Sequence, residues 1–253
     1  MCGQCKGEGI DRRSLMALGL AAAATAAGAA RVIAPTAAAA ASGKHTSLTS
    51  DQALSALKDG NARFVSEPQA CTIGLAQARA RVAEAQAPWA TIISCADSRV
   101  PPELVFGGLG LGELFVARNA GNLVDTATMG TIEYGAAVLG SPLIVVMGHS
   151  QCGAVHAACD VVTKNATFPG SIGPMIDPIV PAAIAAHDAP GDFLANATRE
   201  SAKRTAARLG ATSFVLADLV AAGKLKIVAA HYELASGIVT FLTEGEPPRS
   251  APG

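Results

Sequence analysis

The chain has 253 residues, of which 50% are hydrophobic and 15% are charged, a composition that indicates a globular protein with a substantial core and excludes a disordered one. Its formal net charge is −1, and its lysines and arginines form no run longer than a pair, so a nucleic-acid-binding surface is excluded as well. We therefore expect a small-molecule partner, with no nucleic acid and, for the mature protein, no membrane.

The beginning of the chain predicts an export signal. Arg12 and Arg13 precede an apolar stretch and an alanine run that reaches Ala30, and cleavage patterns of A-x-A type lie between Ala37 and Ser42. Adjacent arginines at this place resemble a twin-arginine signal, which serves proteins that are exported already folded. A transmembrane anchor is the alternative, but glycines and an arginine interrupt the apolar run. We expect a periplasmic protein.

The rest of the chain alternates helical and strand patterns. Helices are expected from a cap at Ser50 to just before Pro68, and then at 73–85, 128–139, 154–163, 196–209 and 212–222. Short apolar runs predict buried strands at 90–94, 113–117, 143–147 and 226–230, with an edge strand at 238–242. Many prolines and glycines between 165 and 191 predict an irregular connection with room for one helix.

This alternation predicts the α/β fold class, with a mainly parallel central sheet of four parallel strands plus an edge strand, flanked by helices. We expect three regions: an export signal over residues 1–41, a single domain over 42–244 and a mobile tail over 245–253.

The six cysteines of the chain must be distinguished from one another before any is assigned a role. Cys2 and Cys5 precede the twin arginines and would be removed with the signal. Four remain, and in an exported protein they could form disulfides: Cys71, Cys95, Cys152 and Cys159. Cys159 follows Cys152 by seven residues on a predicted helix, where a small buried apolar residue would serve equally.

Cys95 and Cys152 differ from the others because they follow predicted strands. Ligands of parallel α/β sheets gather beyond the carboxyl ends of the strands, where Cys95, His149 and Cys152 are all expected to lie. Two thiolates and one imidazole are ligands that zinc prefers, and three protein ligands leave the fourth position open, as in catalytic zinc sites. The spacing therefore predicts a zinc site that can do chemistry.

Asp97 and Arg99 follow Cys95 at alternate positions, so in an extended loop the three side chains project similarly. A carboxylate held by a guanidinium stays ionised and can orient a group on the metal. An ordinary surface ion pair explains the same two residues equally well.

At this point the sequence resembles a known family. The segments that carry the resemblance are Cys-Ala-Asp-Ser-Arg at 95–99, Gly-Glu-Leu-Phe-Val-Ala-Arg-Asn-Ala-Gly-Asn at 112–122, Ile-Glu-Tyr at 132–134 and Gly-His-Ser-Gln-Cys-Gly-Ala at 148–154. Their order and separations are similar to those of the β-class carbonic anhydrases. The likeness extends from about Leu54 to the last strand.

The resemblance implies a role for each matching residue. Zinc, one ion per subunit, would be held by Cys95, His149 and Cys152, with Asp97 and Arg99 as the catalytic, orienting dyad. The resemblance further implies substrate-binding positions at Gln86, Phe115 and Tyr134, partly supplied by a neighbouring subunit, so the protein would be a homodimer or a higher homo-oligomer.

The implied reaction is the zinc-dependent, reversible hydration of carbon dioxide to bicarbonate and a proton. Zinc lowers the pKa of bound water to about 7, and the resulting zinc-bound hydroxide attacks carbon dioxide. No residue is an obvious proton shuttle; His156 and His231 are candidates, although each also suits a structural role.

Two alternatives stand beside this interpretation. Ser150 could be the nucleophile of a serine hydrolase, with Asp218 and His231 following in the required order, although Cys152 replaces the second glycine of G-x-S-x-G. The domain could instead bind zinc or bicarbonate without catalysis, which Asp97 as a permanent fourth metal ligand would favour.

Overall fold

The computed structural model describes residues 45–67, 79 and 82–242. In chain order its elements are α2 (Ser50–Ser66), β1 (Ala90–Cys95), α4 (Pro102–Val105), β2 (Leu114–Asn119), α5 (Thr126–Glu133), the π-helix η2 (Tyr134–Val138), β3 (Leu143–His149), α6 (Gly153–Lys164), α7 (Ile172–Ile176), the 3-10 helix η3 (Asp177–Ile179), α8 (Val180–Ala186), α9 (Phe193–Thr212), α10 (Phe214–Ala221), β4 (Lys226–Tyr232) and β5 (Val239–Leu242).

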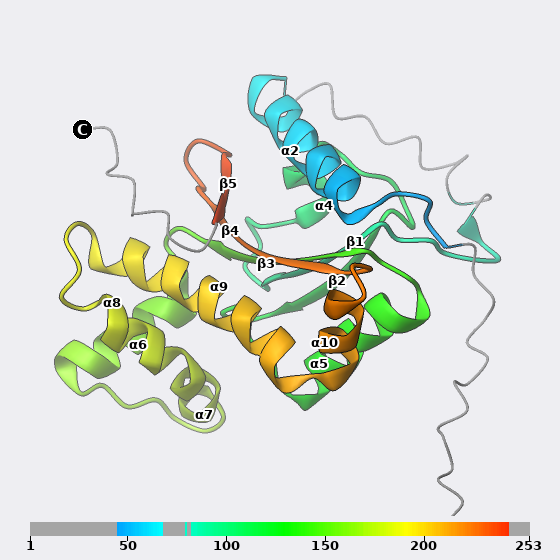
Figure 1. Ribbon diagram of the computed structural model, residues 1–253. Coiled ribbons are helices and arrows are strands. Elements are labelled where there is room, and N and C mark those ends of the chain that lie inside the picture. Colours follow the sequence, from blue (N-terminus) through cyan, green and yellow to red (C-terminus); the bar gives the residue numbers. More distant parts are fainter. Residues whose placement is uncertain (1–44, 68–78, 80–81, 243–253) are drawn as a thin grey trace, which may run out of the picture. The chain divides into compact units, whose positions relative to one another are not determined.

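The five strands form one sheet in the order β2-β1-β3-β4-β5 (Figure 1). The first four are parallel to one another, and β5 runs antiparallel to β4 at the edge. The predicted fold, four parallel strands plus an edge strand, is therefore confirmed. Because β1 and β3 are direct parallel neighbours, their carboxyl ends meet at the same edge of the sheet.

Successive side chains of the central strands face opposite sides of the sheet, and each side is buried under helices. Ile92 packs in a core with Leu57 of α2, whereas its neighbour Ile93 packs in a second core with Leu209 of α9. Accordingly α2 and α4 cover one face, and α5, α9 and α10 cover the other (Figure 1). Burial on both faces explains why these strands are continuous apolar runs.

Helix α2 begins at Ser50, one residue earlier than a Ser50 cap would require, because Thr49 is the cap. The Thr49 hydroxyl accepts from the Gln52 N–H at 3.2 Å, and the Gln52 side chain accepts from the Thr49 N–H at 2.8 Å. This capping box satisfies two donors that the first turn would otherwise leave free.

Asn61 of α2 ties this helix to two distant segments. Its amide group donates to the carbonyls of Val105 at 3.0 Å and Gly237 at 2.8 Å, and its oxygen accepts from the Val239 N–H at 2.8 Å. All of these groups are buried, so the amide replaces water for three backbone groups at once.

The connection between 165 and 191 differs from the prediction. It contains two α-helices, α7 and α8, and the short helix η3, not a single helix in an irregular segment. Pro178 and Pro181 lie in first turns, where a missing N–H costs no helical hydrogen bond, so proline here starts helices instead of ending them.

Other helices also differ from the prediction. The helix expected at 128–139 begins at Thr126, because Asp125 caps it by accepting from the Thr128 N–H at 2.7 Å, and it continues as a π-helix from Tyr134. The short helix α4, Pro102–Val105, was not predicted.

Several predictions lie outside the described residues: the export signal at 1–41 with Cys2 and Cys5, the start of the helix at 73–85 with Cys71, and the tail at 245–253. The predicted helix at 73–85 ends earlier than expected: Val82 is helical, whereas residues 83–85 are not. Within the described part of the chain, no helix combines the length and apolar character that crossing a bilayer requires.

Candidate metal centre

Three ligand side chains gather at the carboxyl edge of the sheet. Cys95 is the last residue of β1, His149 is the last residue of β3, and Cys152 precedes the first turn of α6. Their ligand atoms all lie within 4.8 Å of one another. Cys95 is 6% exposed and the other two are 0% exposed, so the three ligand residues are buried.

The turn between His149 and Cys152 is tight. Gln151 adopts φ +56°, a left-handed conformation that non-glycine residues rarely take. This conformation reverses the chain directly after β3 and lets α6 begin at Gly153. The reversal brings Cys152 back to His149, as the H-x-x-C spacing predicted.

The imidazole of His149 is oriented by backbone. Its Nδ1 lies 2.9 Å from the carbonyl oxygen of Ser150, which can only accept a hydrogen bond, so Nδ1 carries the proton and Nε2 the lone pair. Among the residues that the structure describes, Nε2 has no hydrogen-bond partner although it is buried. A buried lone pair beside two thiols is costly unless a cation binds it, so the residues present fit a zinc ion.

Cys95 receives support from the segment after β2. The N–H of Gly121 donates to the Cys95 sulfur at 3.4 Å. Gly121 has φ +79°, and a Cβ at this position would come within 2.8 Å of Ile179 and 3.1 Å of Ala154. Only glycine therefore brings this N–H to the sulfur without displacing its neighbours.

The two thiols lie close enough to shift each other's pKa in opposite directions. The neighbouring Cys152 thiol lowers the pKa of Cys95 well below its ordinary value. The same contact raises the pKa of Cys152, and burial adds to the rise. One thiolate and one thiol result, and a divalent cation would displace the remaining proton.

Asp97 and Arg99 form the predicted pair. Arg99 Nε and Nη2 donate to the two carboxylate oxygens of Asp97 at 2.9 and 2.7 Å, and the Arg99 N–H donates to Oδ1 at 2.9 Å. These bonds hold the pKa of Asp97 well below its usual range. Asp97 Oδ2 also lies 4.0 Å from Nε2 of His149, so the ionised carboxylate borders the cluster.

Arg118 was not predicted to have a role in the site. Its Nε donates to the carbonyl of Cys95 at 3.0 Å, and its Nη2 donates to the carbonyl of Asp97 at 2.6 Å. One guanidinium therefore fixes the backbone on both sides of Ala96, between the metal ligand and the carboxylate. The sequence signal for it was its place in the segment 112–122 that carries the family resemblance.

Comparisons with known proteins agree with this geometry. A family model described as carbonic anhydrase matches residues 90–239. A carbonic anhydrase of Mycolicibacterium smegmatis is 38% identical over 188 residues, which cover 74% of this chain and 90% of the relative. Carbonic anhydrase 2 of Mycobacterium tuberculosis is 37% identical over 185 residues, covering 73% and 89% of the two chains.

Among solved structures, the β-carbonic anhydrase of Coccomyxa, determined in complex with acetazolamide, is 28% identical, with a TM-score of 0.57 over 75% of this chain and 86% of that chain. A tetrameric β-carbonic anhydrase of Sordaria macrospora has a TM-score of 0.59 at 23% identity, covering 75% and 95% of the two chains, and shows the same fold.

The chain belongs to the β-class carbonic anhydrases. It is therefore a zinc enzyme, and the family reaction is the reversible hydration of carbon dioxide to bicarbonate.

The three residues that were predicted to bind substrate are not brought to the cluster of their own chain. Phe115 pairs with Thr91 on β1, four residues before the pair of Cys95 with Asn119, which is about 13 Å along the strand. The Phe115 ring lies 6.2 Å from that of Tyr134, which is 43% exposed. Gln86 is exposed and precedes the amino end of β1.

The hydrolase alternative receives no support from the enzyme's structure. The Ser150 hydroxyl donates to Glu233 Oε1 at 2.7 Å and not to a histidine, and Asp218 is exposed on α10. Of the two shuttle candidates, His231 is buried, which lowers its pKa to about 4 and keeps it neutral, whereas His156 is exposed on α6 beside Asp160.

The non-catalytic alternative is also disfavoured. Both oxygens of Asp97 are engaged by Arg99, so this carboxylate is not placed as a fourth metal ligand.

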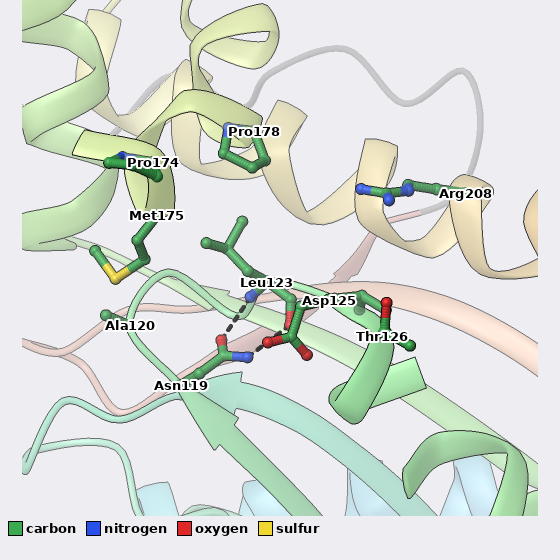
Figure 2. Close-up of a pocket in the computed structure, with 10 residues that line it drawn as sticks. Asn119, Ala120, Leu123, Asp125, Thr126, Pro174, Met175, Pro178 and Arg208 are labelled. Atoms are coloured by element: carbon green, nitrogen blue, oxygen red, sulfur yellow. Dashed lines mark hydrogen bonds between the residues drawn. The ribbon is translucent and has the colours of Figure 1, made fainter. Parts of the chain in front are cut away.

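A separate hollow of about 490 Å³ lies beside the segment that supports Cys95. Figure 2 shows it between Asn119, Leu123 and Asp125 on one side and Pro174, Met175 and Pro178 on the other, with Arg208 reaching toward it from α9. The side chain of Asn119 is already bonded to the backbone of Leu123. None of the three cluster residues lines this hollow.

The unequal ionisation of the two thiols makes a measurable prediction. At pH 7.5 zinc binding should release fewer than two protons per chain: close to one from Cys152, because Cys95 is already ionised, and a fraction of one from the zinc-bound water, whose pKa is about 7. Titration calorimetry in buffers of different protonation enthalpy measures this number, and the apparent affinity should rise by between about tenfold and a hundredfold per pH unit. Two ordinary thiols of pKa about 8.5 would release nearly two protons themselves and bring the total close to three, which would contradict the prediction. Cys159→Ser, outside the cluster, is the control.

Proposed function

We propose that Cys95, His149 and Cys152 hold one zinc ion per subunit and that this site hydrates carbon dioxide. The single observation that carries the assignment is Nε2 of His149, a buried nitrogen that lies within 4.8 Å of two buried sulfurs and has no partner among the described residues. When bound, zinc acts as a Lewis acid and lowers the pKa of water to about 7, which makes a nucleophile available at neutral pH.

Asp97 and Arg99 form the orienting dyad in this proposal. The carboxylate borders the cluster and stays ionised, because Arg99 occupies both of its oxygens and lowers its pKa. An ionised carboxylate can only accept hydrogen bonds, so it turns a reacting hydroxyl group in one direction. Arg118 supports the dyad by holding the carbonyl of Asp97.

The substrate pocket requires a second copy of the chain. Gln86, Phe115 and Tyr134 lie toward the amino ends of β1 and its neighbours, whereas the cluster lies at the carboxyl ends. If they bind substrate, they do so at the cluster of another subunit. The position of β2 at the edge of the described sheet supports this arrangement, because an edge strand offers a surface for a homodimer or larger assembly.

The chain is further proposed to be exported to the periplasm by the signal at residues 1–41, with residues 42–244 as a single catalytic domain followed by the tail at 245–253. The support is the order of basic, apolar and small residues around Arg12 and Arg13.

The identity of the reacting group is tested by two neighbouring substitutions. Cys152→Ser should lower carbon dioxide hydration by at least about 100-fold, because the hydroxyl is a poor zinc ligand. Ser150→Ala, assayed with zinc in excess, should lose less than about tenfold, because a hydroxyl next to the ligands takes no part in the reaction. Stopped-flow hydration near pH 8.5 measures both. Activity that disappears in Ser150→Ala and survives in Cys152→Ser would reverse the assignment.

The dyad is tested by Asp97→Asn. Its amide can donate as well as accept and carries no charge, so kcat should fall about 10- to 100-fold while the zinc content stays at one per chain. Arg99→Lys should also lower kcat, because lysine cannot engage both oxygens. Asp160→Asn, which breaks the 2.9 Å pair with Lys164 on α6, should leave kcat unchanged. Wild-type kcat in Asp97→Asn would exclude the dyad.

The shared pocket is tested by combining two impaired variants. A purified dimer of one Cys152→Ser chain and one Tyr134→Ala chain contains one site with three intact metal ligands and an intact tyrosine only if Tyr134 serves the partner's cluster. If Tyr134→Ala costs about tenfold per site, this mixed dimer, with one full site out of two, should be about fivefold more active than the Tyr134→Ala dimer. A mixed dimer with about half the activity of the Tyr134→Ala dimer would place Tyr134 at its own cluster.

Export is tested in a bacterial host that has the twin-arginine pathway. The purified periplasmic protein should begin near Ser42, as determined by mass spectrometry of its first peptide. Replacing Arg12 and Arg13 together by lysine should leave the uncleaved chain in the cytoplasm. Export of this double variant at the wild-type level would show that a different signal operates.

A further inference from the structure

Ser150, which lies between two of the metal ligands, is fixed from one side by the segment that follows β4. Its N–H donates to the carbonyl of Tyr232 at 2.9 Å, and its hydroxyl accepts from the N–H of Leu234 at 3.0 Å and donates to Glu233 Oε1 at 2.7 Å. Ser150 is only 8% exposed, so water does not compete strongly for these groups.

Glu233 is itself held rigidly. Its N–H donates to the carbonyl of Ile238 and its carbonyl accepts from the N–H of Gly237, both at 2.9 Å, which closes the turn between β4 and β5. The N–H of Ala235 lies 3.4 Å from Oε1. The carboxylate is therefore a fixed anchor that reaches across from β4 to the end of β3.

Two features make the position of Ser150 matter for the cluster. Its carbonyl accepts from Nδ1 of His149 at 2.9 Å. Any movement of Ser150 would therefore tilt the imidazole and weaken the bond that keeps the proton on Nδ1. Its other neighbour, Gln151, has φ +56°, so the turn to Cys152 is locally disfavoured and must be held by contacts from outside.

We propose that Glu233 is a positioning residue of the zinc site, acting through Ser150 to preset the orientation of His149 and the turn to Cys152. Glu233 touches neither zinc nor substrate in this arrangement. The inference rests on the proposed function, because it needs these residues to be the zinc ligands.

The test is zinc affinity, measured by competition with a chromophoric chelator on the full chain well below its unfolding temperature. Glu233→Ala should weaken zinc binding about 10- to 100-fold, the usual effect of removing a group that orients a ligand. Glu233→Gln should stay within about threefold of wild type, because its amide oxygen still accepts from Ser150. Glu200→Ala, which breaks a 2.7 Å pair with Arg204 on α9, is the matched control and should not change affinity.

Ser150→Ala tests the same connection from its other end, and it keeps the proposal falsifiable if Glu233→Ala does not fold. Ser150→Ala should weaken zinc binding to a similar degree. The double variant Ser150→Ala with Glu233→Ala should bind zinc within about threefold of either single variant, because both substitutions break the same chain of contacts.

Zinc affinity equal to wild type in Glu233→Ala or in Ser150→Ala would overturn the inference. So would a loss in Glu233→Gln as large as in Glu233→Ala, because charge and not the hydrogen bond would then matter. Failure of the proposed function gives a different result: wild type and Cys152→Ser would bind zinc equally.

Discussion

The whole site depends on the parallel pairing of β1 and β3. Ser94 is paired with Met147, so Cys95 and His149 follow at the same edge of the sheet with their backbones fixed by the ladder. Both strands are buried on both faces, which leaves little freedom to shift their register, because a slip of one residue would turn every apolar side chain to the opposite face. A metal site built on such strands is positioned by the core and not by a mobile loop.

Around this edge, backbone and side-chain groups position the metal ligands. Gly121 donates to one sulfur, the Ser150 carbonyl orients the imidazole, and Arg118 fixes the segment between Cys95 and Asp97. The ligand set itself is a buried lone pair and two thiols, one of which is ionised. Burying such a set is costly unless a doubly charged cation neutralises it, which explains why these residues fit a metal ion.

The Asp97–Arg99 pair depends on neighbouring positions in the chain, whereas the proposed substrate-binding residues depend on the assembly of two chains. Asp97 and Arg99 are two residues apart and meet by local geometry alone. Phe115 and Tyr134 meet each other, but Phe115 lies about 13 Å along its strand from the cluster of its own chain. The first arrangement needs only a loop of the right shape, whereas the second acquires its proposed role only when two chains assemble.

The sequence alone determined the strands, the α/β class and the zinc ligands, because hydrophobic runs and metal-ligand chemistry are local properties that a linear pattern carries. It also indicated that Asp97 and Arg99 would pair, since they are close in the chain. Only the tertiary structure decided what Ser150 does: the residue that resembles a nucleophile is bonded to Glu233, 83 positions away. The caps Thr49 and Asp125 are local features, each bonded to a residue three positions further along the chain. The tertiary structure also decided the clamp by Arg118, whose partner Asp97 lies 21 positions away. Contacts between distant segments arise from packing, and packing leaves no periodic signal at either partner.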